Sequence, residues 1–216
     1  FRLDGAPDEA VWLGAAALDA FAYPWETLPA PATVFRAFHD GRYFYFSFAV
    51  TDPQVLVKES FGEERATVDV EDRVELFFAP APIDRPDTYF SADAAYALPV
   101  YYALEVDALG RVHDYSMVFY RSAMDSHWAF PGLETAGKRT ENGYSVEGRI
   151  PLASFRSLGL LGPDNTIIAG AFRAEFSGDV NVPAGITQRW ISWVNPRTAA
   201  ADFHVESAFG LFRLAP

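Results

Sequence analysis

The sequence predicts an all-β fold, an antiparallel β-sandwich of two sheets in an immunoglobulin-like or jelly-roll-like arrangement, with one or two short helical turns. Three observations indicate this class. Apolar residues recur at every second position in nine segments, turn-forming residues separate these segments, and helical spacing is confined to short stretches. Half of the 216 residues are apolar, which is enough for a full core, and all-β folds of this length are commonly one domain. We therefore expect a single domain over residues 1–216.

The clearest strand is expected over residues 42–50, where Phe44, Phe46 and Phe48 alternate with less apolar positions before Asp52 and Pro53 end the pattern. Further strands are expected over 33–38, 72–78, 100–106, 111–120, 144–150, 166–176, 189–194 and 209–214. Short helices are expected within 7–12 and 151–159, and proline-containing loops over 79–87 and 181–185. Short turns between so many strands favour an antiparallel sandwich.

The alternation also predicts which side chains face the core. The expected inward set is Phe44, Phe46, Phe48, Val74, Leu76, Phe78 and Leu104. In the segment VEDRVELFF, this register leaves Arg73, Glu75 and Phe77 together on the opposite face of the strand. A charged pair beside an aromatic ring raises the question of whether this face binds a ligand or is ordinary surface.

Charge and composition exclude several classes of function. The chain has 17 Lys and Arg against 29 Asp and Glu, and its net charge of −12 repels a phosphate backbone, so nucleic acid is not an expected partner. Cysteine is absent, which excludes disulfides, thiolate zinc sites and a cysteine nucleophile. No apolar run approaches the roughly 20 residues that span a bilayer. Because the sequence begins at Phe1 inside apparent structure, we expect any export signal to lie upstream.

Seven segments in order carry a family resemblance. They are LDGAPDEAVW, GRYFYFSFAVTDP, VEDRVELFF, YYALEVDALGRVHDY, GYSVEGRIPLASF, FRAEF and WISWVNPRTAAADFHVESAFGLFRL. Together they resemble the family 9 carbohydrate-binding modules and their family 9-like relatives over nearly the whole chain. The resemblance implies a noncatalytic β-sandwich that binds a saccharide, within a secreted, cell-surface or periplasmic protein that degrades polysaccharides. A catalytic domain linked in the same chain is the partner that this resemblance implies.

The resemblance also implies site residues. In similar modules a sugar lies between two tryptophans, while a strand glutamate, an arginine and amide side chains bind its hydroxyls. The glutamate matches Glu75 and one tryptophan matches Trp193. The second tryptophan is expected before the glutamate strand, where residues 65–72 contain none. This departure leaves three alternatives: the ligand differs, sugar binding is lost, or the stacking role passes to Trp25, Trp128, Trp190 or a loop tyrosine.

Charged residues between apolar strand neighbours point to the same kind of site. They are Glu75, Glu105, Glu147, Arg173 and Glu175. Glutamate and arginine beside aromatic rings can bind hydroxyls while a ring stacks on the apolar face of a sugar. The alternative interpretation is solvent-facing residues that pair across neighbouring strands. The expected ligand-binding set is Glu75, Trp193, Arg173, Trp190 and Glu105.

Three functions remain open from the sequence. The first is a carbohydrate-binding module. The second is an interaction or scaffold domain that has lost the sugar site, which the missing tryptophan favours. The third is a glycan-active enzyme, because cross-strand glutamates can reach glycosidase spacing, although the sequence has none of the usual nucleophile or phosphate-loop motifs.

Metal and histidine roles are also open at this stage. The resemblance allows structural calcium, and the segments VTDP, VDVED and GDVN supply oxygen-rich loops without a regular calcium-loop spacing. We expect no other cofactor. His204 is expected to be a structural hydrogen-bonding residue, and His113 with Asp114 to lie at the exit of a turn.

Overall fold

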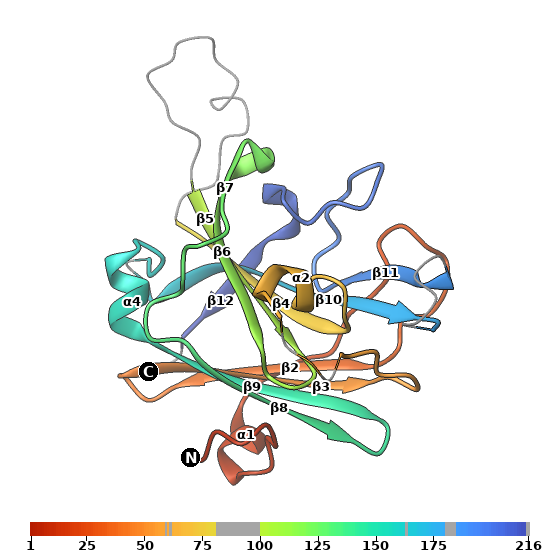
Figure 1. Ribbon diagram of the computed structural model, residues 1–216. Helices are drawn as coiled ribbons and strands as arrows, with labels where there is room; N and C mark the ends of the chain where they lie inside the picture. Colours follow the sequence, from red (N-terminus) through yellow and green to blue (C-terminus); the bar gives the residue numbers. More distant parts are fainter. Residues whose placement is uncertain (59, 61, 81–99, 163, 180–184, 215–216) are drawn as a thin grey trace.

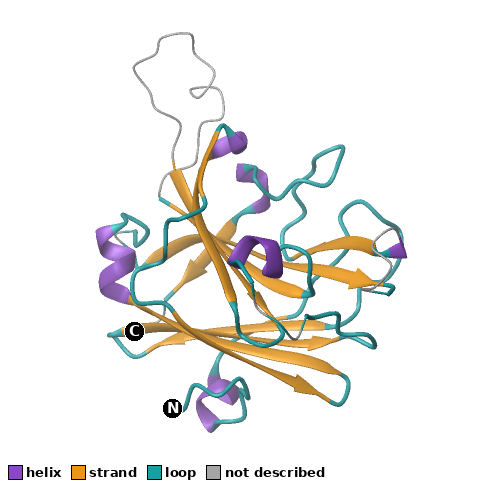
Figure 2. Cartoon of the chain, viewed as in Figure 1, coloured by secondary structure: helices purple, strands orange, loops and turns teal. Residues whose placement is uncertain are grey.

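The chain folds into two antiparallel sheets packed face to face, as the sequence predicts (Figure 1, Figure 2). The computed structural model describes residues 1–58, 60, 62–80, 100–162, 164–179 and 185–214. The strands are β1 (Ala17–Leu18), β2 (Thr33–His39), β3 (Tyr43–Thr51), β4 (Arg73–Ala79), β5 (Val100–Asp107), β6 (Val112–Val118), β7 (Ala123–Asp125), β8 (Glu134–Thr140), β9 (Gly143–Pro151), β10 (Thr166–Ser177), β11 (Thr187–Ser192) and β12 (Gly210–Arg213). The helices are α1 (Ala10–Gly14), α2 (Glu64–Val68) and α4 (Leu152–Ser157), with 3₁₀ turns η1 (Phe119–Arg121) and η3 (Glu206–Ala208).

The two sheets differ in size and in what covers them. The smaller has the order β1-β2-β3-β9-β8, and the larger has β11-β10-β4-β5-β6-β7. β12 also joins the larger sheet, since β10 pairs with β12 through its first residues and with β11 through its last. Figure 1 shows α1 and the N-terminus beneath the smaller sheet, on the side away from the larger one. The outer face of the larger sheet is covered by α2 and by the segment that follows β11 (Figure 1).

The predicted core register is confirmed. All seven residues expected to face inward belong to one buried cluster between the sheets, namely Phe44, Phe46, Phe48, Val74, Leu76, Phe78 and Leu104. Their alternation carries over from one strand to the next because facing residues pair in register, for example Leu76 with Leu104. The opposite positions, Arg73 and Glu75, therefore lie on the outer face of the larger sheet.

That outer face is itself buried, contrary to the solvent-facing alternative. A second apolar cluster covers it, made of aromatic residues that include Phe77, Tyr101, Tyr115, Phe172 and Phe203. Phe203 comes from the long segment after β11 and stacks on Phe172, with ring centroids 4.2 Å apart. The larger sheet is thus covered on both sides, and its charged outer residues lie in a sheltered environment.

Several elements differ from the sequence-based expectation. β8, with the sequence ETAGKRT, is an edge strand whose residues are largely exposed, so it lacks the apolar alternation that reveals a buried strand. β1 and β7 have two and three residues, too few for a periodic pattern. The strand expected over 111–120 ends at Val118, because the backbone turns at Tyr120 and Arg121, with φ of 58° and 59°.

Both expected helices form, and one was missed. α1 begins at Ala10, inside the expected segment 7–12, and ends at Gly14, two residues beyond it. α4 lies entirely inside the expected segment 151–159. α2 has five residues and no periodic apolar face long enough to predict. The loops expected at 79–87 and 181–185 lie largely outside the described residues.

Candidate functional site

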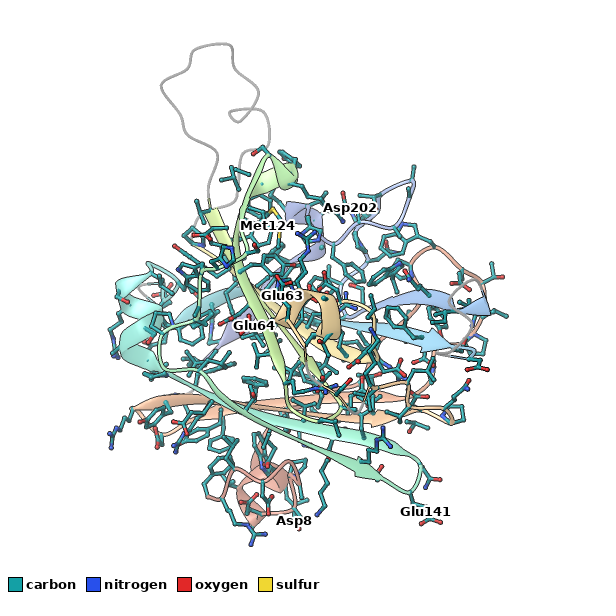
Figure 3. The ribbon with its side chains drawn as sticks, in the orientation of Figure 1. Asp8, Glu63, Glu64, Met124, Glu141 and Asp202 are labelled. Atoms are coloured by element: carbon teal, nitrogen blue, oxygen red, sulfur yellow. The ribbon has the colours of Figure 1, made fainter. Side chains whose placement is uncertain are left out.

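A cavity of about 490 Å³ lies over the outer face of the larger sheet. Its aromatic and sulfur-containing lining is Trp25, Tyr115, Met117, Met124, Trp190 and Phe203. Its charged and imidazole lining is Arg65, Asp69, Arg73, Glu75, Glu105, His113, Arg121, Asp202 and His204. Figure 3 labels two of these residues, Met124 on β7 and Asp202 on the segment after β11. A volume of this size is typical of small-molecule sites.

Strand register creates a polar row on the cavity floor. Glu75 on β4 pairs with Glu105 on β5, and Glu105 pairs in turn with His113 on β6. Because directly paired residues point to the same face of a sheet, the three side chains stand side by side. The next row toward the sheet interior is apolar, with Phe77, Ala103 and Tyr115 in the equivalent positions. The floor is therefore polar along one line and apolar beside it.

Arg73 ties the two glutamates together. Its Nη2 lies 3.0 Å from Glu75 Oε1, and its Nε lies 2.7 Å from Glu105 Oε2. The guanidinium also lies 5.5 Å from the ring centroid of Trp190, a cation–π contact that covers one part of that ring. A further hydrogen bond, 2.9 Å long, runs from Arg73 Nη1 to the Asp69 carbonyl and fixes the orientation of the guanidinium group. Because Arg73 is a buried cation, it compensates negative charge of the two neighbouring glutamates.

Four atoms of this cluster keep unfilled hydrogen-bonding capacity. Glu75 Oε1, Glu105 Oε2, Arg73 Nε and His113 Nε2 are buried with no hydrogen-bond partner among the described residues. The Glu75, Glu105 and Arg73 atoms are held by the ion pairs at 3.0 and 2.7 Å, and each carboxylate oxygen keeps a further lone pair, whereas His113 Nε2 makes neither kind of contact. Buried polar atoms are normally paired, so such a group on a cavity floor is suited to receive polar atoms of a ligand.

The cluster shifts the pKa values of its members. Burial, together with the neighbouring Glu105 carboxylate, raises the pKa of Glu75 to about 8 despite Arg73. Burial lowers the pKa of His113, but the hydrogen bond with Asp69 and the nearby Glu105 carboxylate outweigh this and raise it to about 9. For Asp69, burial acts upward, yet the bond with His113 holds the pKa below its usual range. His113 and Asp69 are therefore an ion pair at neutral pH.

An aromatic corner forms one wall of the cavity. Phe203 contacts both tryptophans: Trp25 at 5.6 Å between centroids, and Trp190 at 5.9 Å with the ring planes perpendicular. Trp25 is locked by a hydrogen bond from its Nε1 to the Thr198 carbonyl, 2.9 Å long. Residues 65–72 contain no tryptophan, and the tryptophans that line the cavity, Trp25 and Trp190, come from segments far away in the sequence.

An ion pair and a hydrogen bond join two segments near the cavity, the turn η1 after β6 and the segment after β11. Arg121 Nη2 lies 3.1 Å from Asp202 Oδ1, and the Tyr120 hydroxyl donates to Glu206 Oε1 at 2.5 Å. His204 pairs through Nδ1 with the Tyr101 hydroxyl, and burial lowers its pKa to about 4. His204 therefore has a hydrogen-bonding partner, as expected, and it also lines the cavity as a neutral ring.

The structure brings three of the five predicted ligand-binding residues together. Glu75, Glu105 and Trp190 all line the cavity. Arg173 does not: it pairs with Val74 on the inner face of the sheet and is fully buried. Its Nη1 donates to the Thr51 carbonyl at 3.0 Å, and its Nη2 pairs with Glu175. The expectation that Arg173 belongs to this group is corrected, since its strand position turns it inward.

Trp193 is also placed elsewhere. It is partly buried, packs against the main core and lies 5.3 Å from Phe212 between ring centroids. Its ring closely approaches Gly210, where a side chain would clash. Trp193 therefore packs on the sandwich and is not part of the cavity lining, whereas Trp190, three residues earlier, faces the cavity.

Several cavity residues were not in the predicted set. Arg73, and not Arg173, is the arginine that contacts Glu75 and Glu105, and alternation had already put it on the face of Glu75. His113 and Asp114 do follow a turn, but they lie within β6 and are buried. The sequence signal that could have found His113 is its period-2 relation to Tyr115 and Met117, which also line the cavity.

The loops expected to suit calcium meet around an arginine. Asp52 of VTDP, Asp72 of VDVED and Glu175 lie close enough to hold one ion. However, Arg173 Nη2 is 3.4 Å from Asp52 Oδ2 and pairs with Glu175. The Asp72 oxygens accept the backbone N–H groups of Leu56 and Phe176. The three carboxylates are thus occupied by a buried guanidinium and by backbone N–H groups, an arrangement that suits Arg173 better than calcium. Part of GDVN lies outside the described residues.

The buried titratable groups make a stability prediction. Glu75 and His113 have raised pKa values in the folded protein, so each stabilises it fully below the unfolded-state pKa and loses that contribution as pH rises through about 8 and 9. Asp72 and Glu175, with pKa values of about 8 and 7, act in the same direction. Between about pH 6 and pH 9 the free energy of unfolding is expected to fall by at least ~2 kcal/mol.

Urea unfolding at the two pH values measures this change. The variant Glu75→Gln removes one titrating group and is expected to flatten the dependence, whereas a wild-type stability that rises toward pH 9 contradicts the assignment. The lowered pKa of Asp69 acts at more acidic pH, whereas that of His204 adds a smaller, opposite gain of stability between about pH 6 and pH 7, where the unfolded-state histidine loses its proton.

The fold and the sequence together assign this chain to a family. A two-sheet sandwich with a cavity of aromatic and carboxylate side chains on one sheet has the makeup of a small-molecule site. The sequence model described as "Carbohydrate family 9 binding domain-like" matches residues 3–215, and the chain belongs to this family. Comparison with curated proteins gives no match. Among the described residues, no helix is long and apolar enough to cross a membrane.

Solved structures share the fold at low sequence identity. A family 9 carbohydrate-binding module from Caldicellulosiruptor kristjanssonii in complex with glucose has 20% identity and a TM-score of 0.60, with 100% of this chain and 91% of that chain covered. The same organism's module in complex with cellotriose has 19% identity and a TM-score of 0.59, with 99% and 89% covered. A candidate carbohydrate-binding protein from Bacteroides uniformis has 17% identity and a TM-score of 0.59, with 92% and 86% covered.

Proposed function

We propose that this protein is a noncatalytic module that binds a saccharide in the cavity over the larger sheet. The observation that carries the proposal is the cavity floor, where Glu75 and Glu105 are held by Arg73 and keep acceptor capacity beside the aromatic corner of Trp25, Phe203 and Trp190. Sugar hydroxyls can donate to these oxygens, and the apolar face of a sugar ring can pack on an indole. The family membership and the glucose and cellotriose complexes of two neighbours support the same ligand class.

The binding role is proposed over a catalytic one because both floor glutamates are engaged by one cation. Arg73 lies within 3.0 Å of Glu75 and 2.7 Å of Glu105. A glycosidase instead needs one carboxyl group free to protonate the leaving group and a second free to attack or to activate water. We further propose that residues 1–216 act as one module of a secreted or cell-surface protein that degrades polysaccharides, for which the family is the support.

The scaffold alternative keeps one specific observation in its favour. Residues 65–72 contain no tryptophan, and in the cavity the Asp69 side chain of this segment pairs with His113 instead. If sugar binding had been lost, the unfilled polar atoms of the floor would have no evident use. Titration with saccharides separates the two proposals, because a scaffold domain is expected to bind none of them.

A pair of tryptophan variants tests the location of the site. Trp190→Leu removes the flat ring from the cavity but keeps apolar volume, and it is expected to weaken cellotriose binding about tenfold or more, close to 1.4 kcal/mol. Trp193→Leu is the matched control, since this ring packs on the core. It is expected to lower the thermal stability and leave binding within about threefold. Calorimetric titration below the unfolding temperature measures both, and the opposite pattern places the site at Trp193.

A further inference from the structure

His113 occupies an unusual position in the cavity. It is 1% exposed, stands beside Glu105 in the polar row and lines the cavity from β6. Its Nδ1 lies 2.9 Å from Asp69 Oδ1 and 3.8 Å from Glu105 Oε2. Its other ring nitrogen, Nε2, is buried with no hydrogen-bond partner among the described residues. One side of the imidazole is thus fixed, and the other has unfilled bonding capacity.

The contact with Asp69 determines whether His113 Nε2 is a hydrogen-bond donor or an acceptor. A carboxylate can only accept, so the short contact requires a proton on His113 Nδ1. Asp69 directly follows α2, which packs against β5 and β6, so the partner of the imidazole is held by a neighbouring element. With the ion pair intact, Nε2 also carries a proton and is a buried, charge-assisted donor.

The row of side chains is therefore mixed in hydrogen-bonding character. Glu75 Oε1 and Glu105 Oε2 offer acceptors, whereas His113 Nε2 offers a donor at the β6 end. A hydroxyl oxygen can accept from an imidazolium while its own hydrogen points to a carboxylate. A ligand with neighbouring hydroxyls matches this order, and an apolar or purely donating group beside His113 leaves the buried N–H unpaired at a cost.

We propose that His113 is a ligand-contacting residue that selects for a hydroxyl oxygen at the β6 end of the cavity, with Asp69 as the residue that positions its ring. This inference rests on the proposed saccharide binding and deepens it, because it assigns one hydroxyl of the sugar to one side chain. Asp69 and His113 then recognise polar substituents of the ligand on the side opposite the aromatic corner.

Deoxy sugars combined with His113 variants test the assignment. The probes are glucose and its monodeoxy analogues, titrated by calorimetry or by ligand-detected NMR. His113→Phe keeps a planar ring and removes both N–H groups, and it is expected to weaken glucose binding about tenfold. One deoxy analogue is expected to bind wild type as weakly as that variant binds glucose, and to lose nothing further in the variant. His113→Gln, which keeps an N–H donor, is expected to recover part of the loss.

Different failures point to different conclusions. If every analogue is weakened by the same factor in His113→Phe, the residue acts through packing alone and the inference is wrong. If the wild type binds glucose and cellotriose and His113→Phe binds them equally well, the inference falls while the proposed function stands. If the wild type binds neither sugar, the proposed function falls first, and the inference with it.

A measurement on the wild type covers the case in which His113→Phe does not fold. The ¹⁵N and ¹H signals of the His113 Nε2–H group are expected to shift on addition of glucose and to gain protection from exchange with water. The analogue that lacks the recognised hydroxyl is expected to leave this signal unchanged. Equal shifts with every analogue contradict the assignment.

Discussion

Phe46→Ala is expected to destabilise the protein by about 3–5 kcal/mol, as large-to-small changes of buried aromatic residues do. Phe46 is fully buried between the sheets, and its ring lies against Gly148 on the paired strand β9, where a side chain would leave no room for it. The substitution therefore opens a cavity that neighbouring side chains cannot fill without moving two strands.

The matched control for Phe46→Ala is an exposed residue of the same strand. Ala49 lies three positions further along β3 and faces solvent, so Ala49→Ser is expected to change stability by no more than about 0.5 kcal/mol. Urea unfolding of the two variants measures the difference. If Phe46→Ala unfolds at nearly the wild-type urea concentration, the register of β3 is wrong.

Arg173→Met is expected to cost about 3–5 kcal/mol of stability while leaving saccharide binding unchanged within about twofold. The guanidinium is 0% exposed and is the cation shared by Asp52 and Glu175, so its removal leaves buried carboxylates without their partner. Because Arg173 is turned to the inner face of the sheet and does not line the cavity, the loss is confined to folding.

A surface arginine on the next strand supplies the comparison for Arg173→Met. Arg189 on β11 pairs with Glu26, and the two side chains are 35% and 34% exposed. Arg189→Met is therefore expected to cost no more than about 1 kcal/mol. A stable Arg173→Met variant that no longer binds saccharide would restore Arg173 to the ligand-binding set and remove it from the structural one.

The parts of the fold that the sequence predicts well are those with strict alternation. In β3 and β4, bulky apolar residues at every second position leave only one register that buries them. β8 is an edge strand held by backbone pairing to β9, and its polar sequence gives no sign of this partner. Its existence depends on a neighbouring strand, which single-sequence periodicity does not report.

The candidate site was predictable in part for the same reason. Alternation places Arg73 and Glu75 on one face, and Glu105 joins them because β4 and β5 pair in register. Trp25 and Phe203 come from segments far away in the sequence, and only the fold brings them to the cavity. Arg173 was predicted from its place between apolar neighbours and Trp193 from the family resemblance, but the structure turns Arg173 to the inner face of β10 and packs Trp193 against the main core.

The sequence also left open why charged residues interrupt the apolar strands. Glu75 and Arg173 lie on different faces of the same sheet, and each has its own buried partner. One pair lies on the floor of a cavity, and the other is buried beside Asp52, with Arg173 on the inner face of the sheet. Composition cannot separate these two roles, because both require a buried ion pair.

Titration of cellotriose into the wild type and Glu75→Leu, side by side in a calorimeter, tests the central claim most directly. Glu75 is 2% exposed on the cavity floor, and leucine removes its acceptor oxygens while Glu105 still pairs with Arg73. A buried polar group of the ligand that loses its partner costs about 1–3 kcal/mol, so the wild type is expected to bind and the variant to bind at least about tenfold more weakly. Equal binding of cellotriose by both proteins, or by neither, contradicts saccharide recognition at Glu75.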